Sequence, residues 1–197
     1  MSITTLYAEL VVVGTGALLS VLLLVYAFFG ASWVPKLSAD SIGTVISLVP
    51  ALSVVYVLGI IVVSISHRIF DGLEEHLRTG LLGEINYGEV RNELYTSPNV
   101  QNLVHDFEFR RSKVRICRGW YLNCVLLMVA LLACYGNGRT GLQVTLFGCA
   151  ALAFLAAGAF VSWHTATTTE LDWIKSFAQH RNKAQGAKQS LPPFIDG

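Results

Sequence analysis

The chain has 197 residues, of which 14% are charged and 53% hydrophobic, and its mean hydropathy is +0.55. Soluble proteins average about 25% charged and about 45–50% apolar residues, so this composition predicts an integral membrane protein and excludes an ordinary soluble domain. The formal net charge is only +1, although the lysines and arginines are unevenly distributed along the chain.

Four apolar stretches are long enough to cross the hydrocarbon core of a bilayer, which takes about 17–25 helical residues. In chain order they are Leu10–Trp33, Ile42–Ser66, Gly119–Tyr135 and Leu142–Trp163. The first also resembles a signal peptide, because Gly30-Ala31-Ser32 imitates a cleavage site. Residues 2–9 carry no lysine or arginine, however, and the apolar run exceeds the usual length of about 7–15 residues, so we expect a true span.

The basic residues lie mainly on one side of these spans. The connections 34–41 and 136–141 hold one lysine or arginine each, whereas the segment 67–118 holds eight and the tail holds four. Positive residues accumulate in cytoplasmic loops. We therefore expect a multi-pass protein of the plasma or inner membrane with both termini and the segment 67–118 in the cytoplasm.

These observations predict an all-α fold, a four-transmembrane-helix bundle whose helices extend into a cytoplasmic helical layer. Its expected segments are 1–66 (two spans), 67–118 (cytoplasmic helical insert), 119–166 (two spans) and 167–197 (cytoplasmic helix and irregular tail).

Within the insert, apolar periodicity carries the second span to about Thr79, and a short helix is expected at Tyr87–Tyr95. Ser97-Pro98 is typical of the start of a helix, which we expect to continue through the third span. After the fourth span, Thr167–Glu170 resembles a capping box that restarts a helix, and the last stretch, 185–197, is expected to be irregular.

Two sets of charged residues recur at helical spacing beside the spans. One precedes the third span: Arg111, Arg115 and Arg118. The other follows the second span: Arg68, Asp71, Glu75 and Arg78. Both helices meet the same membrane surface and must be antiparallel, so we expect Asp71 opposite Arg115 and Glu75 opposite Arg111.

Three interpretations of this arginine face remain open from the sequence. The arginines orient the span and contact lipid phosphates, or they form a structural ion-pair network with the acidic residues. Alternatively, they bind an anion, a nucleotide or a lipid headgroup.

A second group of polar residues lies at the cytoplasmic boundary of the spans: Glu9, His67, Asn123 and His164. Ionisable residues at that depth are functional candidates, and histidines there titrate near neutral pH. The alternative is that these side chains only extend to the headgroups.

In the fourth span, Cys149, Ala153 and Ala157 recur every four residues. Small residues at this spacing allow membrane helices to approach closely. The stripe fits a self-association face and packing within the chain equally well.

The sequence contains none of the motifs H-E-x-x-H, G-x-S-x-G, P-loop or G-x-G-x-x-G. We expect no metal or cofactor, and the basic residues lack the interleaved aromatic residues that stack on nucleic-acid bases. No charged residue occupies the middle of a span, which disfavours secondary active transport.

The leading functional hypothesis is a small homo-oligomeric membrane protein that forms a passive pore or channel, or perturbs the membrane, and is gated or assembled through its cytoplasmic helices. The alternative is a non-conducting membrane anchor or regulatory subunit that recruits a soluble cytoplasmic partner. A third class, a lipid-active membrane enzyme, would use His67, Asp71, His105 and the arginine face.

Overall fold

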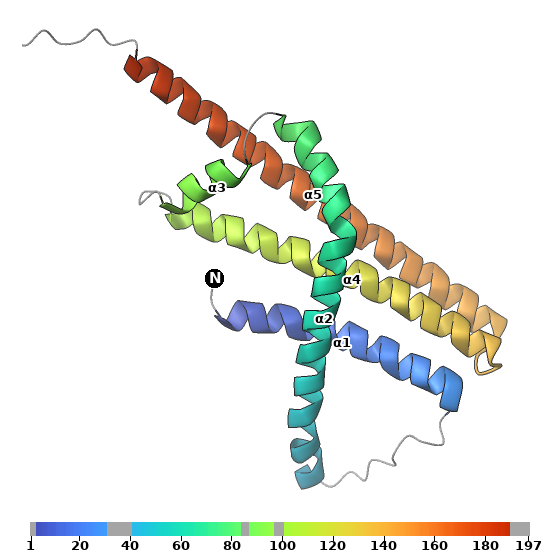
Figure 1. Cartoon of the computed structure of the whole chain (residues 1–197). Coiled ribbons are helices and arrows are strands. Elements are labelled where there is room, and N and C mark those ends of the chain that lie inside the picture. The colour runs from blue at the N-terminus through green and yellow to red at the C-terminus, as the bar shows by residue number, and fades with distance from the viewer. Residues whose placement is uncertain (1–2, 31–40, 84–86, 97–100, 190–197) are drawn as a thin grey trace, which may run out of the picture.

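The structure, a computed structural model, describes the chain except residues 1–2, 31–40, 84–86, 97–100 and 190–197. Side chains are described at 6–30, 50–83, 87–90, 92 and 108–179. Across the described residues the chain forms helices and no strand (Figure 1): α1 (Ile3–Phe29), α2 (Ser41–Leu82), α3 (Tyr87–Thr96), α4 (Gln101–Gly136) and α5 (Leu142–Gln189).

Four of these helices are long and apolar enough to cross a membrane. They are α1, α2, α4 and α5. The last three contain the second, third and fourth predicted stretches, whereas α1 ends at Phe29, before the end of the first, whose residues 31–33 lie outside the described residues. Many large apolar side chains on the four helices point outward, among them Phe147 and Phe154, both 80% exposed. The prediction of an all-α chain with four potential spans is therefore confirmed.

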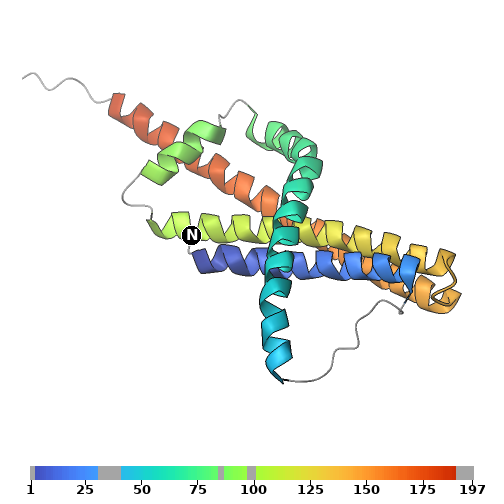
Figure 2. The same cartoon turned by 60° about the horizontal axis from the view of Figure 1, so that its bottom comes forward.

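The four long helices do not all lie side by side. Both views show α1, α4 and the first half of α5 running alongside one another, whereas α2 crosses them at a steep angle (Figures 1 and 2). The steep crossing of α2 (Figures 1 and 2) departs from the side-by-side arrangement of four helices that we expected.

At the crossing of α1 and α2, two glycine positions have no room for a side chain. A Cβ atom on Gly14 would lie 1.9 Å from the carbonyl oxygen of Val55, and one on Gly59 would lie 2.1 Å from that of Leu10. Glycine at both positions lets the two backbones touch, as small residues do between membrane helices. The backbones of α1 and α2 therefore approach each other closely at the crossing.

Three helices run without a break from their apolar parts into a charged end, which we define as residues 67–118 and 167–179. These are α2, which continues past its apolar stretch to Leu82, α4, which runs from Gln101 to Gly136, and α5. The predicted short helix is confirmed as α3, while the expected start at Ser97-Pro98 lies outside the described residues.

The capping-box prediction at Thr167–Glu170 is wrong, because α5 continues through it to Gln189. The hydroxyls of Thr168 and Thr169 donate to the Thr165 carbonyl oxygen in the preceding turn at 3.0 and 2.8 Å. Their hydrogen bonds point back into a continuing helix instead of capping a new one.

Two small apolar clusters hold the charged end together. The first cluster joins α2, α4 and α5 through Phe70, Val114 and Trp163. The rings of Phe70 and Trp163 meet edge to face, with their centres 4.7 Å apart. Leu82 on α2, Val90 on α3 and a patch of α5 around Leu171 form the second cluster. Between these two clusters, along α2 and α5, lies a group of polar side chains. Apolar packing on either side holds their helices in place.

Candidate functional site

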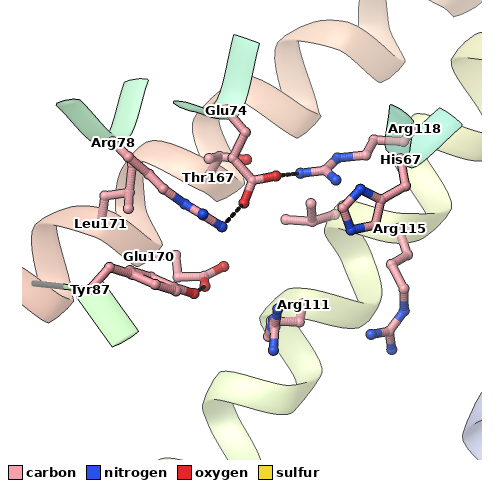
Figure 3. A pocket seen from close by; sticks show the side chains of 11 residues that line it. His67, Glu74, Arg78, Tyr87, Arg111, Arg115, Arg118, Thr167, Glu170 and Leu171 are labelled. Atoms are coloured by element: carbon pink, nitrogen blue, oxygen red, sulfur yellow. Dashed lines mark hydrogen bonds and ion pairs between the residues drawn. The ribbon is translucent and has the colours of Figure 1, made fainter. Parts of the chain in front are cut away.

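The charged end contains a polar cavity of about 170 Å³ (Figure 3). Side chains from four helices line it, and the polar ones are His67, Glu74 and Arg78 of α2, Tyr87 of α3, Arg111, Arg115 and Arg118 of α4, and Thr167 and Glu170 of α5. The cavity therefore brings together segments that are up to about a hundred residues apart in the chain.

Glu74 connects α2 to α4. One of its carboxylate oxygens accepts a hydrogen bond from Nη2 of Arg78 at 2.5 Å, one turn along the same helix, and the other accepts one from Nη2 of Arg118. The Arg118 side chain is only 7% exposed and that of Glu74 18%. The Arg118 guanidinium also lies 5.9 Å from the ring centre of Phe70 and 5.8 Å from that of Trp163, within the range of cation–π attraction.

A second polar contact connects α3 to α5. The Tyr87 hydroxyl donates a hydrogen bond to Oε1 of Glu170 at 3.0 Å, and the Arg78 guanidinium lies 4.4 Å above the Tyr87 ring. Burial and the nearby Glu170 carboxylate raise the pKa of Tyr87 to about 12. The phenol therefore keeps its proton at neutral pH and acts as a donor.

Polar contacts also connect α1 to α4. Nε and Nη2 of Arg115 donate to the two carboxylate oxygens of Glu9, at 3.0 and 3.3 Å, and the Glu9 side chain is only 7% exposed. Two turns further along α4, the fully buried Asn123 donates from Nδ2 to the carbonyl oxygen of Val13 at 2.7 Å. Such paired Arg–carboxylate hydrogen bonds fix orientation as well as distance.

The ion pairs differ from the expected register. Asp71 pairs with His67 one turn before it, and Arg115 pairs with Glu9 on α1. Glu75, expected opposite Arg111, is exposed, and it is Glu74 that pairs with α4, through Arg118. Because α2 crosses α4 steeply, only a short part of it faces the arginines, and its charged residues cannot follow those of α4 turn by turn.

Four residues of the cavity were not predicted as site residues from the sequence: Glu74, Tyr87, Thr167 and Glu170. Only Glu74 had a local signal, its spacing of four residues before Arg78, which is typical of a helical ion pair. The other three meet through contacts between helices, which no local pattern encodes.

The residues expected at the span boundary separate into two groups. Glu9 and Asn123 are buried and bind groups on a neighbouring helix, and His67 lines the cavity from an exposed position. His164, by contrast, is exposed on α5 beside the Trp163 ring, and Arg68 is exposed on α2.

The small-residue stripe of α5 lies mostly outside the packing between helices. Ala153 and Ala157 are exposed and Cys149 is half-buried, whereas Ala156, which is not part of the stripe, is buried. Within the chain α5 therefore packs through the face that carries Ala156.

Comparisons with known proteins found no family model, no curated protein and no solved structure that matches this chain. In the part of the chain that the structure describes, no group of three His, Cys, Asp or Glu residues is placed to hold a metal ion. The side chain of His105 lies outside the described residues.

The contact between Tyr87 and Glu170 gives a testable prediction. Tyr87→Phe removes a hydrogen bond to a charged acceptor, worth about 1.5–3 kcal/mol, and should loosen α3 from α5. Amide hydrogen exchange in α3 should become faster by roughly tenfold or more. Tyr135→Phe, at an exposed phenol of α4, is the control and should leave exchange unchanged; equal exchange rates in the two variants would contradict the contact.

Proposed function

We propose that the chain is a multi-pass protein of the plasma or inner membrane that self-associates into a passive pore or channel, or a membrane-perturbing assembly, gated through its cytoplasmic helices. In this arrangement both termini and the charged end face the cytoplasm. The main support is that α2, α4 and α5 each pass without a break from an apolar segment into the charged end.

Unbroken helices are stiff over this length, so a rearrangement of the charged end would move the apolar segments with it. The ion pairs of Glu74 with Arg118 and of Glu9 with Arg115 connect α2 and α1 to α4 at the junction between the two parts. If these helices can pack at the junction in two ways, the assembly has two states, for example open and closed. Shifts of packed helices act as switches in this way in other proteins.

The surface of α5 supports self-association. Ala153 and Ala157 are exposed, and small residues at four-residue spacing allow a second helix to approach closely. Because Ala156 serves the packing within the chain while Ala153 and Ala157 stay exposed, these two alanines are available to a second copy.

The proposal is tested by measuring the size of the purified protein in detergent and ion flux across proteoliposomes. Ala153→Phe should weaken association about tenfold or more, because overpacking an interface costs about 1–3 kcal/mol, and flux should fall with it. Ala151→Phe is the matched control, since Ala151 is also exposed but lies on the opposite side of α5.

A monomeric wild type, or a folded wild type that carries no flux at any pH or voltage, would contradict the pore. The anchor function would then be the better hypothesis, with a soluble cytoplasmic partner expected to copurify with the chain from its host.

A further inference from the structure

Three residues that line the polar cavity each carry a buried donor atom without a hydrogen-bond partner among the described residues. These atoms are Nε of Arg78, Nε of Arg118 and the hydroxyl of Thr167. Arg118 and Thr167 are 6% and 4% exposed, so bulk water does not satisfy them. A buried donor left without a partner costs about 1–3 kcal/mol, which makes the cavity lined by these three side chains a candidate ligand site.

The charges around the cavity favour an anion. The single negative charge of Glu74 is shared between two guanidinium groups, those of Arg78 and Arg118. Arg111 lies across the cavity from Glu74, and the opposing carboxylate is Glu170, to which Tyr87 donates (Figure 3). The wall formed by α2 and α4 therefore carries more positive charge than its carboxylate neutralises.

The size and the directions of the donors narrow the class of anion. A single water molecule needs about 10–15 Å³ of cavity volume. The cavity offers about 170 Å³, so it has room for a ligand larger than water. The residues that carry the unsatisfied donors lie on three different helices, α2, α4 and α5, around the cavity. A planar carboxylate is matched by one guanidinium fork, whereas a tetrahedral anion presents oxygens to donors on several sides.

We propose that this cavity binds a phosphate group, with Arg78, Arg118 and Thr167 as its donors. Two kinds of molecule carry such a phosphate group, a lipid headgroup and a soluble phosphate ester. Arg118 directly precedes Gly119, the first residue of the third predicted span, which is the depth at which lipid headgroups meet basic residues. A soluble phosphate ester would reach the same donors from the charged end.

The test uses the full-length chain purified in an uncharged detergent. One arm titrates inorganic phosphate in a calorimeter, with chloride at equal ionic strength as the reference. The other arm offers mixed micelles of phosphatidic acid and phosphatidylcholine and identifies retained lipid by native mass spectrometry. Heat from phosphate alone indicates a soluble ligand, preferential retention of phosphatidic acid alone indicates a headgroup, and both results together indicate a site for the phosphate group itself.

Three substitutions on α5 decide whether phosphate binds in this cavity. Thr167→Val removes an unsatisfied hydroxyl at nearly constant shape, so the fold should be kept while affinity falls about tenfold, the effect of one hydrogen bond to a charged group. Glu170→Gln removes the opposing charge and should tighten binding about fivefold. Thr169→Val, an exposed threonine on the same helix, should bind as the wild type does.

Absence of both phosphate heat and preferential lipid retention in the wild type would overturn the proposal, as would equal binding by the wild type and Thr167→Val. Because binding is measured in detergent without reference to ion flux, the result is independent of whether the chain conducts.

Discussion

Glu74→Ala should lower the free energy of unfolding by about 3 kcal/mol, the largest effect expected of any single charged residue at the site. Removing one partner of a buried ion pair costs about 3–5 kcal/mol, because the other charge remains buried without compensation. Arg118, at 7% side-chain exposure, is that other charge. We expect the lower end of this range because Glu74 itself is 18% exposed and Arg78 can turn towards solvent.

Glu75→Ala is the matched control, since it changes the same residue type one position along α2, where the side chain is exposed. It should alter stability by no more than about 0.5 kcal/mol. Thermal unfolding of both variants in the same detergent gives the comparison. Equal losses would contradict the position of Glu74 between Arg78 and Arg118.

A double variant separates the loss of an interaction from the burial of an unpaired charge. Replacing both partners of a buried ion pair by apolar residues of similar volume is often neutral or stabilising. Glu74→Met with Arg118→Met should therefore be more stable than Glu74→Ala alone. A double variant less stable than Glu74→Ala would mean that Arg118 contributes through contacts other than this ion pair.

Gly14→Ala should destabilise the chain by about 3 kcal/mol, the upper end of the usual cost of overpacking. The added Cβ atom would lie 1.9 Å from the Val55 carbonyl oxygen. A backbone oxygen cannot move aside as the end of a flexible side chain can, so α1 and α2 must separate. Thermal unfolding in detergent measures the loss.

Gly59→Ala should have a similar effect, because its Cβ atom would lie 2.1 Å from the Leu10 carbonyl oxygen at the same crossing. Once the helices have been forced apart by one substitution, the second should add less than its own single effect. Gly158→Ala is the control, since nothing lies within 4 Å of its added Cβ atom. Unchanged stability of Gly14→Ala would mean that α1 and α2 do not cross at these glycines.

Local patterns in the sequence were enough to find the helices. The four apolar runs and the periodic residues before Thr79 predicted α1, α2, α4 and α5, and the stretch Tyr87–Tyr95 predicted α3 to within one residue. These predictions succeed because the length of an apolar run and helical periodicity are properties of neighbouring residues. The arginines of α4 were likewise recognised from their spacing alone.

The partners of those arginines were decided by the tertiary structure. Neighbouring positions on a helix point about 100° apart, so the choice between Glu74 and Glu75 depends on how α2 is rotated against α4. That rotation goes with the steep angle at which α2 crosses the other helices (Figures 1 and 2), and no pattern within α2 encodes it.

The composition of the cavity has the same origin. Tyr87, Thr167 and Glu170 are unremarkable where they stand in the sequence, and Thr167–Glu170 even resembled the start of a helix that does not begin there. They meet the arginines only because α5 continues unbroken beside α4, and because α3 packs onto it through Val90. The amino-acid sequence alone therefore determined which segments are helical and apolar, since that depends on adjacent residues, whereas the three-dimensional packing determined which charges share a cavity, since that depends on distant ones.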